Sequence, residues 1–242
     1  MFIIQESWLK RYWPVLLATV TLLSGLACVL PSLPWAATPT PTARPATPTE
    51  TINLPPHPSY SVQADRNTLG DPAAPVHIDV WEDFQCPACA YYSINVEPQI
   101  IQRYVASGQA LYTYHFFAFL DGGHPNGESH QAANAALCAA EQGKFWEYHA
   151  LLVANWNGEN QGAFRNARLF DFARFLALNE DDFGVCFRAQ RYADQIRADY
   201  ELGLQWGVQG TPSLFVNGVI VTPGYVPGLE AVTEAVEAAL AR

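Results

Sequence analysis

The stretch Trp81-Glu82-Asp83-Phe84-Gln85-Cys86-Pro87-Ala88-Cys89 places two cysteines two residues apart, where an apolar strand gives way to a helix. Before it, Val76, Ile78 and Val80 alternate with other residues at the period of a β-strand. Cys86 then occupies the expected N-cap and Pro87 the first helical position, where a residue without an N–H is tolerated. We therefore expect a helix to begin at Pro87.

This position gives the two thiols different chemistry. The unpaired N–H groups and the dipole of the helix stabilise an anion at Cys86, so its thiol pKa should be low. Cys89, one turn later, can form a disulfide with Cys86 or attack a mixed disulfide there. The alternatives are half of a zinc site or two cysteines without a role, but the sequence has no second C-x-x-C and no H-x-x-x-H.

Four separated motifs resemble the DsbA-like thiol:disulfide oxidoreductases of the thioredoxin superfamily. They are Gly70-Asp71-Pro72 through Pro75-Val76, Asp83 to Cys89, Gln142 to His149, and Gly210-Thr211-Pro212-Ser213 with Phe215-Val216-Asn217-Gly218. They follow the family's order, from about residue 60 to the C-terminus. The resemblance implies a thioredoxin fold of the α/β class, interrupted by an all-helical insertion domain.

The resemblance also implies roles for the residues around the cysteine pair. Pro87 and Ala88 would form the active-site loop, and a cis Thr211-Pro212 peptide would face it and leave the Thr211 backbone free for an extended substrate. A trans proline that merely starts a strand is the alternative. The strong oxidases of the family often have a histidine where this chain has Ala88, so Cys86 has one stabiliser fewer and we expect a less oxidising pair.

Proton transfer to and from Cys89 has two candidate residues. The better-known oxidases have a glutamate six residues before the first cysteine, where this chain has Val80. Glu82 and Asp83 flank the motif, and a nearby carboxylate could exchange a proton with Cys89. For Glu82, a solvated surface position is an equally good interpretation.

Composition limits the possible classes of protein. The 242 residues allow one domain with additional segments, and half of them are hydrophobic. A net charge of −10 argues against a nucleic-acid partner.

Cys28 lies in an apolar N-terminal segment, and the four other cysteines form an even set typical of an oxidising compartment. Of these, Cys138 and Cys186 lie on two predicted helices, and we expect a structural disulfide between them, with two buried free thiols as the alternative.

The N-terminus has the composition of a membrane segment followed by a spacer. Residues 1–35 contain Lys10 and Arg11 and then an uncharged run long enough to span a bilayer. We expect an anchor; a cleaved signal peptide and a lipidated Cys28 are the alternatives. Residues 36–58 are rich in Pro and Thr and predict an extended linker, or else a partner-binding Pro-rich motif.

The rest of the chain predicts three parts. Residues 59–126 form the first part of the thioredoxin-like domain, with strands near 76–80 and 110–120 joined by a helix that Pro98 kinks or breaks. Residues 127–206 show only helical spacing and form the insertion. Residues 207–242 form the second part, with strands 213–216 and 219–221 joined at Asn217-Gly218, and a last helix.

Together these observations predict an enzyme that introduces disulfides into exported proteins. We expect it to be anchored in the membrane with its catalytic domain outside the cytoplasm, at the cell surface or in the periplasm. Secretion after signal cleavage is the alternative. Its substrates would be reduced or unfolded exported proteins, and the family implies reoxidation by a quinone-linked membrane protein. We expect no metal and no cofactor. A reductase or isomerase using the same two cysteines, or a non-enzymatic metal-binding protein, remains an alternative.

Overall fold

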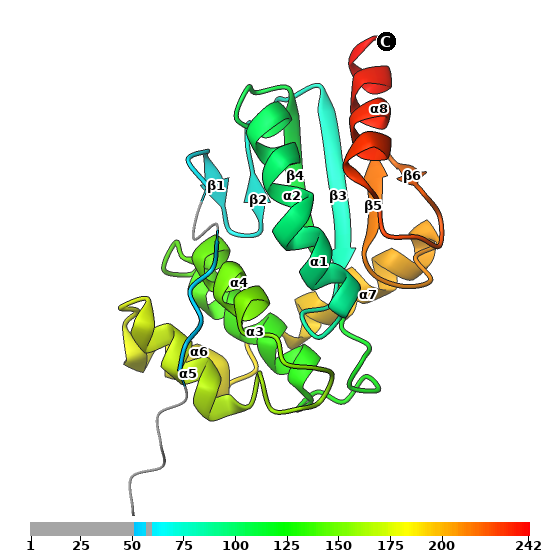
Figure 1. Cartoon of the computed structure of the whole chain (residues 1–242). Helices are drawn as coiled ribbons and strands as arrows, with labels where there is room; N and C mark the ends of the chain where they lie inside the picture. Colours follow the sequence, from blue (N-terminus) through cyan, green and yellow to red (C-terminus); the bar gives the residue numbers. More distant parts are fainter. Residues whose placement is uncertain (1–50, 57–59) are drawn as a thin grey trace, which may run out of the picture. The chain divides into compact units, whose positions relative to one another are not determined.

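A six-stranded sheet runs through the described part of the chain in the order β1-β2-β4-β3-β5-β6 (Figure 1). The strands are β1 (Ala64–Asp65), β2 (Thr68–Leu69), β3 (Val76–Glu82), β4 (Ala110–Phe116), β5 (Ser213–Val216) and β6 (Val219–Val221). Strands β3 and β4 are parallel, and the other neighbouring pairs are antiparallel. The sheet is therefore mixed, with the motif strand β3 between β4 and β5.

The crossover between β3 and β4 is helical, as predicted. It consists of α1 (Pro87–Asn95), α2 (Glu97–Ile100) and the π-helical turn η1 (Ile101–Val105). The break falls at Val96, two residues before Pro98. Proline has no N–H to continue the hydrogen-bond ladder, so the helix changes course there.

The two faces of β3 belong to different hydrophobic clusters. Val76, Ile78 and Val80 pack in the large core cluster, which also contains residues of α1, α2 and the C-terminal helix α8 (Leu229–Leu240). Trp81 points to the opposite face, where it packs in a second cluster with Phe117, Val208 and Phe215. The period-two alternation of this strand therefore separates the two layers.

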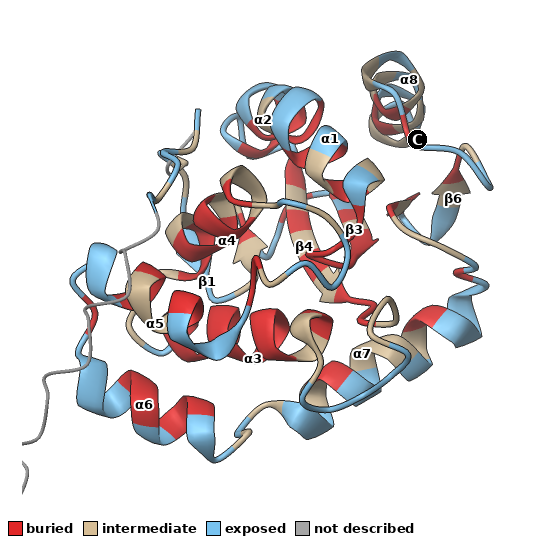
Figure 2. Ribbon diagram, turned by 60° about the horizontal axis from the view of Figure 1, so that its bottom comes forward, coloured by how far each residue is buried: buried red, intermediate tan, exposed pale blue. Residues whose placement is uncertain are grey.

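Between β4 and β5 the chain is helical. The helices are α3 (Glu128–Ala140), α4 (Phe145–Ala154), α5 (Asn166–Phe175), α6 (Glu180–Arg188) and α7 (Ala193–Trp206). Helix α3 is the most buried of them, and Figure 2 shows it surrounded by the others. A disulfide joins Cys138 of α3 to Cys186 of α6, as the cysteine count predicted.

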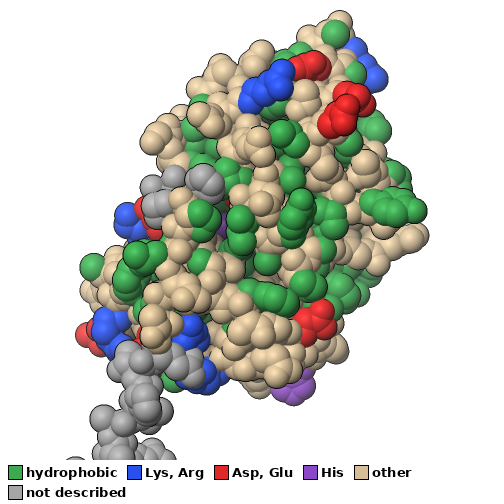
Figure 3. Space-filling view, in the orientation of Figure 1, with side chains coloured by type: hydrophobic (Ala, Val, Ile, Leu, Met, Phe, Trp, Pro, Cys, Tyr) green, Lys and Arg blue, Asp and Glu red, His purple; other side chains and the backbone are tan. Residues whose placement is uncertain are grey.

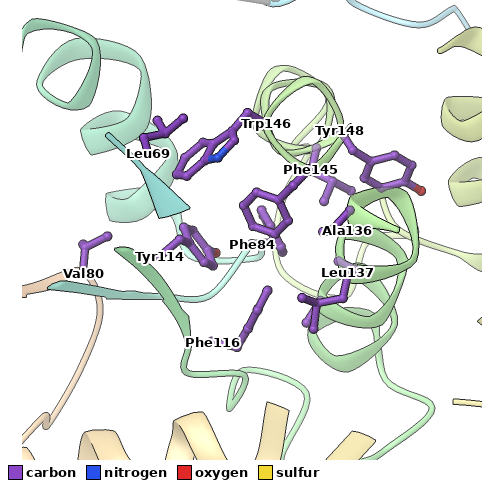
Figure 4. Packing of buried hydrophobic residues seen from close by; sticks show 14 of the residues in the cluster. Leu69, Val80, Phe84, Tyr114, Phe116, Ala136, Leu137, Phe145, Trp146 and Tyr148 are labelled. Carbon is purple, nitrogen blue, oxygen red and sulfur yellow. The ribbon is translucent and has the colours of Figure 1, made fainter. Parts of the chain in front are cut away.

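Aromatic rings join the helical segment to the sheet. Figure 4 shows Phe84, Tyr114 and Phe116 on the sheet side and Phe145 and Trp146 on α4. The rings of Phe84 and Tyr114 stack at 5.4 Å, and Tyr114 meets Phe145 edge to face at 5.8 Å. Because these contacts continue the large core, the helices and the sheet share one interior.

Two features of the sheet differ from the prediction. The β1–β2 hairpin was not predicted, because each strand has only two residues. Strand β4 ends at Phe116 and not at Leu120. The Asp83 carboxylate accepts the N–H groups of Phe119 and Leu120 at 2.9 and 3.1 Å, which removes them from the ladder.

The structure is a computed structural model that describes residues 51–56 and 60–242. The predicted anchor or signal segment, and the linker up to residue 50, lie outside the described residues. Within the described residues, no helix is both long and apolar enough to cross a membrane. The described end of the linker is not a free spacer, because Asn53 exchanges hydrogen bonds with Asn155 after α4.

Candidate active site

Cys86 is the N-cap of α1, as predicted. Its backbone is extended, at φ −74° and ψ 121°, and its sulfur accepts a hydrogen bond from the Cys89 N–H at 3.4 Å. Pro87 is the first helical residue and is exposed, and Ala88 is partly exposed. Both cysteines are free thiols, and Cys86 retains 7% of its surface while Cys89 retains 3%. The sequence therefore places one sulfur at the helix end and the other one turn inside.

The two thiols have opposite pKa shifts. Hydrogen bonding from Cys89, aided by Thr211 and by the N–H groups of Ala88 and Cys89, lowers the pKa of Cys86 to about 7 despite its burial. For Cys89, burial comes first, and the neighbouring Cys86 and Glu82 add to it, so its pKa is well above the ordinary value. At neutral pH, Cys86 is partly ionised and Cys89 keeps its proton.

The loop before β5 closes the other side of Cys86. The Thr211–Pro212 peptide bond is cis, and the Cys86 thiol donates to the Thr211 carbonyl at 3.3 Å. A surface groove of about 610 Å³ extends from here, lined by Ala88, Trp206, Pro212 and the loop that carries Tyr225. The predicted cysteine pair and proline loop are therefore adjacent, and Ala88 between the cysteines lines the groove together with Thr211 and Pro212.

Glu82 is a buried carboxyl at the end of β3, with only 2% of its surface exposed, so the solvated-surface interpretation was wrong. Ser93 donates to its Oε2 at 3.2 Å. Its Oε1 has no hydrogen-bond partner among the described residues. Burial, then repulsion from Glu97 and Cys86, raises its pKa well above the ordinary value, against hydrogen bonds from Ser93 and Cys89.

Asp83 is also buried, but its carboxylate is fully occupied. Its Oδ1 accepts the Ser129 hydroxyl at 2.7 Å and the Gln85 N–H at 2.9 Å, while its Oδ2 accepts two backbone N–H groups of the loop after β4. Burial raises its pKa, although these hydrogen bonds act against the rise. Asp83 therefore holds the loops around the motif together, and Glu82 has the free oxygen.

The sequence interpretation missed three polar residues that surround Glu82. Ser93 binds it directly, Glu97 is fully buried nearby, and Tyr60 donates to Glu97 Oε1 at 2.6 Å. A signal for two of them was present, because Cys89, Ser93 and Glu97 follow one another at four-residue spacing. Polar residues at that spacing lie on one face of a helix.

Comparison with known proteins identifies the family. The family model described as Thioredoxin matches residues 63–237. The Na(+)/H(+) antiporter NhaA 3 of Salinispora tropica is 35% identical over 158 residues, which cover 65% of this chain and 22% of the antiporter. The chain thus spans about a fifth to a quarter of such antiporters.

A second relative and a solved structure also match the chain. The probable disulfide bond formation protein D of Bacillus anthracis is 24% identical over 169 residues, covering 69% of this chain and 75% of that protein. The crystal structure of oxidised BdbD from Bacillus subtilis superposes with a TM-score of 0.65 at 20% identity, covering 79% of this chain and all of that one (100%). The fold is therefore that of BdbD, and the chain belongs to the thioredoxin family.

Proposed function

We propose that this protein oxidises thiols of exported proteins to disulfides outside the cytoplasm, with Cys86 as the exchanging sulfur and Cys89 as its partner. One observation carries the proposal. The low-pKa thiol at the helix end meets the cis Thr211–Pro212 loop at 3.3 Å, while the second thiol is buried and protonated. A thiolate that is stable at the helix end is a good leaving group, which favours transfer of the disulfide to substrate.

The reaction consists of two exchanges. A substrate thiolate attacks Cys86, the Cys86–Cys89 bond breaks, and Cys89 leaves with the electron pair. Glu82 then gives Cys89 a proton, since its pKa is raised and its carboxyl lies beside that thiol. A second substrate thiolate attacks the mixed disulfide, the substrate is oxidised by two electrons, and Cys86 departs as a thiolate.

The groove beside the cysteines supports an unfolded protein as substrate. Its rim includes exposed apolar side chains, notably Tyr225 and Val226, and Tyr91 and Ile94 are exposed on α1. On the face that carries α1 and α2 in Figure 1, Figure 3 shows several hydrophobic side chains with few charges among them. Apolar exposed surface of this kind fits a chain that has not yet buried its own apolar residues.

The enzyme must be reoxidised after each cycle, and a quinone-linked membrane protein is the acceptor we propose. An N-terminal membrane anchor would keep the catalytic unit near such a partner. Replacement of Cys89 by alanine tests the whole scheme, because it removes the thiol that resolves the mixed disulfide. When Cys86 of this variant is first converted to a mixed disulfide with a small thiol such as glutathione, exchange should release that thiol and leave reduced exported proteins disulfide-linked to Cys86, which supports the proposal.

The redox potential decides the direction of the reaction. A potential near −120 mV supports oxidation, whereas one near −270 mV would make the protein a reductase. The control for trapping is Cys86→Ala, which should form no adduct. Adducts in that variant, or none with Cys89→Ala, would contradict the assigned roles.

A further inference from the structure

Glu97 is a second buried carboxyl close to the cysteine pair, and the reaction above does not use it. It begins α2 and has no exposed surface (0%). Its two oxygens accept hydrogen bonds from Tyr60 at 2.6 Å and from Tyr112 at 3.2 Å. Burial of a carboxylate without a neighbouring cation costs free energy, and this cost favours the protonated form of Glu97.

Glu97 and Ser93 share a small pocket that reaches the surface. Its volume of about 20 Å³ has room for roughly one water molecule. Ser93, Glu97, His149 and Tyr60 line it, together with Pro55 and Pro56. Ser93 also donates to Glu82, so its hydroxyl lies between the pocket and the carboxyl next to Cys89.

The charged and titratable groups around the two carboxyls favour a shared proton. The titratable groups that face them are Tyr60, Cys86, Cys89, Tyr92, Tyr112, Tyr114 and His149, and none of these is a lysine or arginine. Burial lowers the pKa of His149 to about 3, so that ring is neutral at physiological pH. Burial raises the pKa of Glu97 to about 7, and Glu97 in turn raises that of Glu82. Burial and mutual repulsion therefore both favour a proton on the pair.

We propose that Glu97 relays protons between Glu82 and solvent, so that Cys89, Glu82, Ser93, Glu97 and Tyr60 form one proton path. This inference rests on the proposed function. When Cys89 leaves as a thiolate, it takes the proton of Glu82. Glu97 reprotonates Glu82 through Ser93 and the pocket, and solvent reprotonates Glu97 beside Tyr60. The reverse sequence carries the proton outward when Cys89 attacks a mixed disulfide.

The test compares Glu97→Gln with the wild type in the reduction of the oxidised enzyme by a dithiol, from about pH 5 to about pH 9. Glutamine keeps the volume but carries no exchangeable acid. We expect the rate to fall roughly 10-fold or more, near the low end of what a proton-transfer group contributes. The pH at which the rate declines should also move down, because Glu82 loses the neighbour that raises its pKa.

Three further variants separate a relay from a structural role. Glu97→Asp keeps an acid and should recover part of the rate, and Tyr60→Phe, which removes the hydroxyl at the surface end, should slow the same step. Tyr104→Phe is the matched control, since Tyr104 makes a similar hydrogen bond to Glu237 at 3.1 Å. The thiolate pKa of Cys86 should not change in Tyr60→Phe or Tyr104→Phe.

The outcomes distinguish the relay from the proposed function. A wild-type rate and pH profile in Glu97→Gln would overturn the relay and leave the oxidase proposal standing. Equal slowing in Glu97→Gln and Glu97→Asp at every pH would show a structural role only, which also overturns it. A wild-type protein that exchanges no disulfides with thiols would remove both.

Discussion

Replacement of Cys89 by alanine should raise the pKa of the Cys86 thiol. The Cys89 thiol makes the largest contribution to the shift of this pKa from 9.0 to about 7. The backbone N–H of residue 89 remains in the variant, and so does Thr211. We therefore expect a rise of about one unit, to a value still below that of an ordinary cysteine.

The consequence for reactivity is calculable. With a pKa of about 7, half of Cys86 is thiolate at neutral pH, and one unit higher the fraction is about a tenth, roughly fivefold less. A more basic thiolate is intrinsically about threefold more nucleophilic, so alkylation at neutral pH should slow only about twofold. Above about pH 8 the order should reverse, and the variant should react faster than the wild type.

Ultraviolet absorbance of the thiolate, followed across pH in the reduced protein, measures the pKa directly. Cys86→Ala is the control that removes the titration. A lowered folded-state pKa stabilises the folded reduced protein by up to roughly 3 kcal/mol above pH 9, and this is lost as the pH falls through about 7. An unchanged Cys86 pKa in Cys89→Ala would refute the assignment of the thiol as the main cause.

Three other changes test the scaffold. Replacing Cys138 and Cys186 by alanine opens a loop with a separation of 48 residues, and urea unfolding should show a loss of about 4 kcal/mol, whereas no loss would contradict the loop-entropy argument. Gly203→Ala brings a Cβ within 2.9 Å of the Trp81 ring, so the melting temperature should fall by the equivalent of roughly 1–3 kcal/mol; an unchanged value would mean that α7 shifts freely. Burial opposes charge on His115, but the carboxylates of Asp199 and Asp79 beside it raise its pKa to about 9. Its contribution to the free energy of unfolding is therefore complete below about pH 6.5 and is lost as the pH rises through about 9. The variant His115→Gln should flatten this dependence of the unfolding free energy on pH.

The elements around the motif could be predicted because short-range patterns determine them. Strand β3 has period-two alternation, and α1 begins at a cysteine followed by proline, so local geometry fixes both. The turn at Asn217-Gly218 joins β5 to β6 with both residues at positive φ, as that dipeptide predicts.

The burial of the carboxyls could not be predicted in this way. Glu82 ends a strand and Glu97 begins a helix, and either position is commonly exposed. Their burial depends on β4 and α4, which are distant in sequence and supply Tyr112 and His149. The β1–β2 hairpin escaped prediction for a similar reason, since β2 is fixed by its pairing with Thr113 and Tyr112 of β4.

Cys86 and Cys89 differ in pKa because they lie one helical turn apart. At the N-cap, the N–H groups of Ala88 and Cys89 and the Cys89 thiol stabilise the charge on Cys86, and the thiolate is favoured. One turn inside, the N–H groups are already used by the helix, and the neighbouring Cys86 and Glu82 disfavour a charge on Cys89. Burial therefore outweighs the opposing contribution of Thr211 and disfavours the Cys89 thiolate, and its proton must travel through a protein group. The low-pKa sulfur of Cys86 is also the one beside the groove, so the substrate is bonded to the thiol that is easier to displace. A proton path is needed only for Cys89, which lies farther inside the protein.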